Sequence, residues 1–208
     1  MDAREAQDAP AYPAAPWRMC GELYLSLFRL TEPVDELRPS GVHGVAFVSY
    51  QEPSPLTYSE LLVARPLGKE HGRRVSISDI WVDSATSMAG GRELWAIPKG
   101  LCDFSLESSH TGPVSRTDWS ASIDRRPIAE ASFTDVSRAA LLTPFRGGTW
   151  QPALESGGPP RTADLRGSGK SLPCRGRWRF DPDGPLGWLA GARQLASFRM
   201  AHFRMSFG

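Results

Sequence analysis

The stretch 91–101, GRELWAIPKGL, holds the residue whose type and surroundings best suit it to chemistry. Lys99 lies there among apolar neighbours, in a chain whose 24 basic side chains include only three lysines. Burial among apolar side chains disfavours an ammonium, so these surroundings predict a lowered lysine pKa and a free amine that can attack a carbonyl carbon. The alternative is a surface lysine whose stem covers apolar groups while its amine reaches water. Lys99 is the first candidate for a catalytic group.

Two further charged residues stand in apolar, strand-like runs. Glu60 interrupts the run YSELLVA, and a carboxylate in a buried strand must be paired, be hydrogen-bonded or carry a raised pKa. It is therefore a candidate proton donor or acceptor. Arg29 ends the apolar run 19–30 and can bind a substrate carboxylate through two parallel bonds, or pair with Glu60. For both residues the alternative is an outward-facing surface position.

Composition restricts the classes of function. Hydrophobic residues make up 40% of the chain and charged residues 23%, which is typical of a globular protein and not of a disordered one. The net charge of +1 gives no excess of positive charge for a nucleic acid or an anionic membrane. We expect a small-molecule substrate and neither nucleic acid nor membrane as partner.

Metal-binding, nucleotide-binding and export signals are missing from the sequence. The three cysteines form no CxxC pair, the four histidines lack ligand spacing, and no GxGxxG, Walker A or GxSxG motif occurs. We therefore expect no metal and no cofactor. The N-terminus lacks the basic start and apolar run of a signal peptide, and no run of 18 apolar residues follows, so the expected location is the cytoplasm.

Alternating apolar residues predict a chain built mainly of strands. Residues 1–16 contain three prolines and no alternation, so they are predicted to be a flexible tail before a single domain, 17–208. One short helix is expected at 84–95, capped by Ser84 and ended by Pro98, and a second before a final strand within 187–207. Strands are expected at 19–30, 44–51, 56–67, 73–83, 101–108, 115–123, 126–134, 140–150, 161–168 and 173–180. This pattern favours a mainly β (α+β) fold, a closed or nearly closed antiparallel β-barrel.

The string DIWVDSATSMAGGRELWAIPKGL (79–101), together with YSE (58–60), resembles the acetoacetate decarboxylase-like superfamily. The resemblance implies a barrel with an apolar internal cavity and a tendency to form homo-oligomers. By position, Lys99 matches the lysine that forms an imine with a keto acid, Glu60 matches the family's acid, and Arg29 matches an arginine beside the active site. Gly100 departs from the family pattern, because it replaces a second lysine that is credited with lowering the pKa of the first.

A second departure concerns the substrate. The family's second cavity acid should fall near Val48, where this sequence has no carboxylate, so a ligand larger and more apolar than acetoacetate is expected. The side chains expected to bind it are Tyr58, Phe47, Val48, Trp81, Met88 and Trp95.

Three functions fit these residues. The first is a lyase-type enzyme that forms a Schiff base between Lys99 and a keto acid or ketone, for decarboxylation, aldol condensation with dehydration, or cyclisation. The second is a cyclase of an apolar, polyketide-like biosynthetic intermediate that acts without an imine, through shape and hydrogen bonds from Lys99, Glu60 or Tyr58. The third is a non-catalytic protein that binds small apolar ligands in the same cavity.

Overall fold

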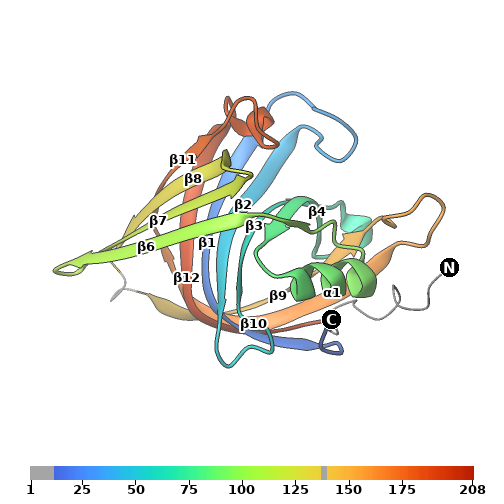
Figure 1. The fold of residues 1–208 in the computed structure, drawn as a ribbon, viewed down its shortest axis with the longest axis horizontal. Coiled ribbons are helices and arrows are strands. Elements are labelled where there is room, and N and C mark those ends of the chain that lie inside the picture. The colour runs from blue at the N-terminus through green and yellow to red at the C-terminus, as the bar shows by residue number, and fades with distance from the viewer. Residues whose placement is uncertain (1–11, 137–139) are drawn as a thin grey trace.

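A closed barrel of seven strands forms the larger part of the molecule (Figure 1). The computed structural model describes residues 12–136 and 140–208, so most of the expected tail lies outside the described residues. The barrel strands follow the order β3-β2-β1-β12-β10-β9-β4, and pairing of β4 with β3 closes the ring. Their bounds are β1 Trp17–Leu30, β2 Gly41–Gln51, β3 Tyr58–Pro66, β4 Arg74–Val82, β9 Leu141–Gln151, β10 Arg161–Pro173 and β12 Arg193–Phe207.

The barrel is mixed and not purely antiparallel as expected. Strand β4 runs parallel to β9 over only two residue pairs, and it is also parallel to the short strand β5 (Gly100–Leu101). The side chain of Gln151 extends the short β4–β9 ladder. Its amide oxygen accepts from the Ile77 N–H at 2.7 Å, and its amide nitrogen donates to the Ile77 carbonyl at 2.9 Å. Gln151 is 1% exposed, so this side chain replaces a missing backbone partner inside the barrel wall.

A second, four-stranded sheet covers part of the barrel's outer face. Its order is β11-β8-β7-β6, with bounds β11 Arg175–Phe180, β8 Arg126–Asp135, β7 Val114–Ile123 and β6 Asp103–Thr111. Side chains alternate along a strand, so Phe47 faces this sheet and stacks on Trp119 and Trp178, at 5.0 and 5.2 Å between ring centroids. Its neighbour Val48 belongs to a different apolar cluster, inside the barrel.

The inner cluster combines barrel strands with the α-helix. Strands β1, β2, β3, β4, β10 and β12 contribute apolar side chains to it, and α1 (Ala85–Trp95) contributes Trp95. Figure 1 shows α1 beside β4 and β10, and the helix contacts both strands. Two short 3-10 helices, Lys69–His71 and Gly187–Leu189, complete the described elements. The second helix expected from the sequence is thus a single 3-10 turn.

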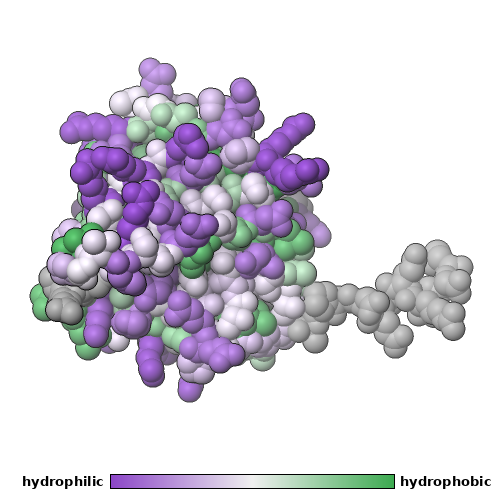
Figure 2. All heavy atoms as spheres, turned by 60° about the vertical axis from the view of Figure 1, so that its left-hand side comes forward, coloured by the Kyte–Doolittle hydropathy of each residue, from purple (hydrophilic) through white to green (hydrophobic). Residues whose placement is uncertain are grey.

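The surface of the molecule is mostly hydrophilic on the face shown in Figure 2, with small, separate apolar patches. Within the described residues, none of the helices has the length and apolar character needed to cross a membrane.

Candidate active site

Helix α1 and the turn after it place Lys99. Ser84 caps the helix, because its hydroxyl accepts from the Ser87 N–H at 3.2 Å. The helix ends at Trp95 and Ala96 adopts a left-handed conformation, with φ of 53°. The Ala96 N–H donates to the Arg92 carbonyl at 3.1 Å, which is the bond expected of a helix that ends in a left-handed residue, and the Ile97 N–H donates to the Gly91 carbonyl at 3.1 Å. This ending turns the chain back toward the barrel, so that residue 99 enters the interior.

The Lys99 amine is enclosed by oxygen atoms. Its Nζ donates to Glu60 Oε2 at 2.9 Å, to Ser87 Oγ at 3.0 Å and to the Tyr58 hydroxyl at 3.3 Å. The side chains of Lys99 and Glu60 are each 4% exposed. An ammonium has three protons to donate, so these three contacts satisfy it completely. The amine itself thus lies in a compact polar cluster, and Tyr58, one member of that cluster, also belongs to the inner apolar cluster.

The other oxygen of Glu60 has a partner of its own. The Tyr50 hydroxyl donates to Glu60 Oε1 at 3.1 Å, and the rings of Tyr50 and Tyr58 lie 4.5 Å apart. Burial, followed by the nearby charge of Glu60, raises the pKa of Tyr50 well above its ordinary value. Tyr50 therefore stays protonated as a hydrogen-bond donor. Both oxygens of the carboxylate are held, which fixes its orientation toward Lys99.

Gly91 lets the lysine stem pass against the helix. A Cβ added at Gly91 would lie 2.8 Å from Lys99 Cδ and 2.9 Å from Cε, closer than real contacts allow. The residue after Gly91 is Arg92, and its Nη1 donates to the Lys99 carbonyl at 3.1 Å. The glycine thus makes room for the side chain, and the arginine holds the backbone.

The charge state of Lys99 differs from the sequence prediction. Burial lowers the pKa of the amine, as predicted, but the charge of Glu60 and the hydrogen bonds that the amine donates to Glu60 and Tyr58 outweigh it. The net effect is a pKa raised above the ordinary lysine value. The prediction of a lowered pKa was wrong for this state of the site, because the sequence did not show that Glu60 would contact the amine.

Gly100 faces away from the amine. It pairs with Trp81 on β4, and a Cβ added to it would lie 3.2 Å from Trp81 Cδ1. Trp81 packs with the cluster between the barrel and the four-stranded sheet. In this structure a side chain at position 100 would thus point toward that cluster and not toward the Lys99 amine.

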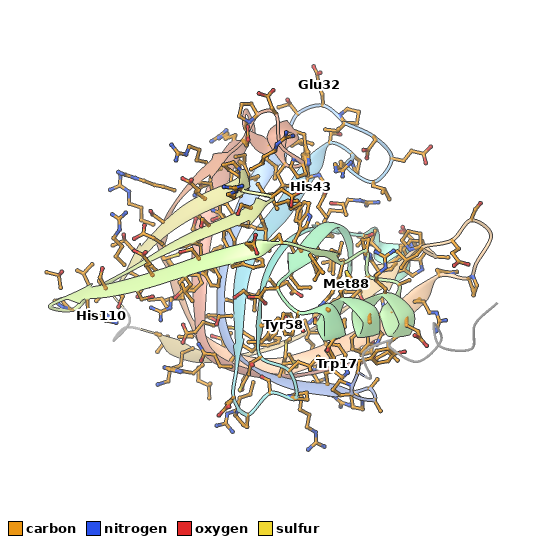
Figure 3. The ribbon with its side chains drawn as sticks, viewed as in Figure 1. Trp17, Glu32, His43, Tyr58, Met88 and His110 are labelled. Atoms are coloured by element: carbon orange, nitrogen blue, oxygen red, sulfur yellow. The ribbon has the colours of Figure 1, made fainter. Side chains whose placement is uncertain are left out.

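The expected binding residues fall into two groups. Tyr58 contacts Lys99, Val48 is the cross-strand partner of Glu60, and Met88 and Trp95 pack in the inner cluster. Figure 3 shows Tyr58 beside α1, the helix that carries Met88. The expectation that Phe47 and Trp81 face the same space is not met, because both side chains lie on the opposite side of the barrel wall.

Arg29 is not part of this cluster. It is exposed and pairs with Val42 and Arg193. Glu60 on β3 pairs with Val48 on β2, and Val48 pairs with Leu23 on β1, so Leu23 is the β1 residue at the same height as Glu60. Arg29 lies six positions after Leu23, which is about 20 Å of strand at roughly 3.3 Å per residue. The expectation that Arg29 pairs with Glu60, or holds a substrate beside Lys99, is therefore not met.

The match to a family model decides which family the chain belongs to. The model described as acetoacetate decarboxylase (ADC) matches residues 32–164, more than half of the chain, and this range includes Glu60, Ser87 and Lys99. The chain belongs to the acetoacetate decarboxylase family. A search of curated proteins found no match.

Solved structures of acetoacetate decarboxylase-like enzymes share the fold. The enduracididine biosynthesis enzyme MppR, in complex with pyruvate, superposes with a TM-score of 0.68 at 17% identity, covering 98% of this chain and 92% of its own. An acetoacetate decarboxylase-like enzyme from Sphingomonas wittichii RW1 gives a TM-score of 0.68 at 15% identity, with 100% and 96% covered. The acetoacetate decarboxylase from Legionella pneumophila gives 0.66 at 16% identity, with 97% and 91% covered.

Sequence reasoning missed three residues of this family member's site: Tyr50, Ser87 and Gly91. Ser87 and Gly91 lie in the quoted string 79–101, and their spacing of one helical turn was a usable signal that both face the same neighbour. Tyr50 had no local signal, because its contact with Glu60 depends on how β2 and β3 pair. Among the described residues, no group of three potential metal-binding side chains converges at this site or elsewhere.

Proposed function

We propose that this member of the acetoacetate decarboxylase family is a lyase-type enzyme that forms a Schiff base between Lys99 and a keto acid or ketone. The observation that carries the proposal is the buried lysine with a carboxylate 2.9 Å from its amine. A buried lysine among proton-accepting oxygens has both the nucleophile and the base that imine formation needs. Decarboxylation, aldol condensation with dehydration, and cyclisation all proceed from such an imine.

The chemistry begins with a proton transfer, because the raised pKa of Lys99 makes the ammonium the resting form. Glu60 takes one proton from Nζ, and the free amine adds its electron pair to the carbonyl carbon of the substrate. The carbonyl oxygen takes one proton from the amine and one from Glu60 and leaves as water, and the nitrogen keeps its last proton. The resulting iminium accepts the electron pair that is released when a bond at the neighbouring carbon breaks.

The hydroxyl groups around the amine support this sequence of steps. Ser87 and Tyr58 each lie within hydrogen-bond distance of Nζ, so they can hold the departing oxygen as it replaces their contact with the ammonium. The related enzyme MppR has been solved with pyruvate and with the condensation product of pyruvate and imidazole 4-carboxaldehyde. Ligands of this chemical type are thus reasonable first substrates to test here.

Reductive trapping tests the proposal directly. The protein is incubated with a panel of keto acids, ketones and aldehydes, reduced with borohydride, and digested for mass spectrometry. We expect a covalent adduct on Lys99 and on neither Lys69 nor Lys170, both of which are exposed. If turnover of a substrate is established while no adduct ever forms on Lys99, the imine mechanism is wrong.

One observation favours a second candidate, the cyclase that acts without an imine. The raised pKa of Lys99 keeps the amine charged, and a charged amine stabilises a developing oxyanion by hydrogen bonding without becoming a nucleophile. Turnover of a long apolar substrate that persists in Lys99→Arg, which keeps the charge but forms no imine, would favour this candidate over the first.

A further inference from the structure

Five arginines lie together on the barrel's outer wall, on the part that the four-stranded sheet leaves uncovered. We call this group the arginine belt, and each of its members is exposed. Its members are Arg18, Arg73, Arg146, Arg166 and Arg204.

The strand register places these side chains on one face. Arg146 pairs with Arg166, Arg166 pairs with Ser206, and Ser206 pairs with Arg18, so a single row crosses β9, β10, β12 and β1. Directly paired residues share a face of the sheet, and adjacent strands lie about 4.8 Å apart, so this row spans about 15 Å. Arg204 lies two residues from Ser206 and therefore on the same face.

Their charge is not neutralised within the part of the chain that the structure describes. None of the five guanidinium groups forms an ion pair with a carboxylate there. Asp164 lies two residues before Arg166 on the same face of β10, and it is paired with Arg74 at 2.8 Å. Like charges placed this close repel one another, so the belt is an unbalanced positive patch on a chain whose net charge is only +1.

The surface between the arginines is hollowed and partly apolar. A hollow of about 450 Å³ is lined by Arg18, Arg166 and Arg204 together with Met19, Met205 and Pro53. A second hollow of about 480 Å³ shares Arg166 and adds Arg73 and Arg146, with Pro144 and Phe145. Arginine and methionine are enriched at protein interfaces.

We propose that the arginine belt is a docking surface for an acidic surface of a partner protein. The exposure of all five guanidinium groups favours a broad partner over a small ligand, which a pocket would enclose. Single-stranded nucleic acid is less well matched, because such sites stack bases on aromatic rings and only Phe145 lines either hollow. Carboxylate side chains would bind the guanidinium groups through paired hydrogen bonds.

Fluorescence anisotropy tests the proposal with a labelled oligoglutamate peptide as the acidic probe. The belt variant is R166Q/R204Q, and R18Q/R146Q is a second pair in case the first folds poorly. The matched control, R175Q/R177Q, removes two exposed arginines from the four-stranded sheet that also form no ion pair among the described residues. Circular dichroism and thermal unfolding establish that each variant is folded.

We expect the wild type to bind the peptide with an affinity that falls as salt is added, and the belt variants to bind it about tenfold more weakly. The control should stay within about twofold of the wild type. Equal weakening by the control, or no binding by the wild type, would overturn the proposal. Tighter binding of a single-stranded oligonucleotide of equal charge, or of phosphatidylserine vesicles, would also overturn it and assign the belt to that partner.

Discussion

Lys99 Nζ lies 2.9 Å from Glu60 Oε2, and both side chains are almost completely buried. The two residues come from different elements, the turn after α1 and strand β3, so the pair joins the helix to the barrel wall. Burial is the largest single influence on the pKa of Lys99, and Glu60 together with Tyr58 outweighs it, so this carboxylate helps to decide when the amine is available.

Replacing Glu60 by Gln should move imine formation to lower pH. Without the carboxylate, burial is left as the main influence and lowers the pKa of Lys99, so more free amine is present near neutral pH. The measurement is the yield of borohydride-trapped adduct with a reactive aldehyde as a function of pH. In the wild type the yield should rise only toward alkaline pH, and an unchanged profile in Glu60→Gln would contradict the role given to this carboxylate.

Removing the lysine alone should destabilise the fold strongly. Lys99→Met leaves a buried carboxylate without its cation, at an expected cost of about 3 kcal/mol in the free energy of unfolding near neutral pH. Protonation removes the charge of a buried carboxylate, so this penalty should shrink as the pH falls. Urea unfolding at several pH values measures this.

The double variant Lys99→Met with Glu60→Gln is the matched control for that experiment. It removes both charges, so most of the lost stability should return. A double variant that is as unstable as Lys99→Met would mean that the lysine stabilises the fold by packing and not by charge pairing.

Gly91→Ala should disturb Lys99 specifically. Alanine normally stabilises a helix relative to glycine by about 0.5–1 kcal/mol, but here its Cβ would collide with Cδ and Cε of the lysine. We expect the yield of trapped adduct to fall at least several-fold. The neighbouring Gly90→Ala is the control, because its Cβ would meet Trp17 and Tyr12 instead, so it should lower stability and leave the pH profile of trapping unchanged.

Gln151→Leu should weaken the closure of the barrel. The change removes two hydrogen bonds and leaves the buried N–H and carbonyl of Ile77 unsatisfied, at a cost of about 2–4 kcal/mol in the free energy of unfolding. Urea unfolding is the measurement, with the exposed Gln51→Leu as a control expected within about 0.5 kcal/mol of the wild type. A Gln151→Leu protein of wild-type stability would show that backbone pairing alone closes the ring.

Arg29→Gln should leave Lys99 chemistry unchanged. The side chain is exposed on β1, about 20 Å of strand away from the residue level with Glu60. Adduct yields with a keto acid and with a neutral ketone should both match those of the wild type. A selective loss of the keto acid adduct would restore Arg29 to the site as a carboxylate-binding residue.

The sequence by itself determined the kind of fold and the central pair of the site. Alternating apolar residues located the strands, since period-two alternation is the direct signature of a half-buried strand. Ser84 located the start of α1, since a hydroxyl in that position caps a helix. Lys99 and Glu60 stood out because charges inside apolar runs need a structural or chemical reason.

Only the tertiary structure decided what surrounds that pair. Strand β2 is buried on both faces, so its sequence could not show that Val48 points into the barrel and Phe47 points away from it. The contact of Tyr50 with Glu60 and the closure of the ring by Gln151 depend on strand pairing, which local patterns do not encode. The pKa of Lys99 is raised, whereas the sequence predicted it to be lowered, for the same reason. Neighbouring residues indicate the burial of the amine, but the opposing charge of Glu60 is 39 positions away in the chain.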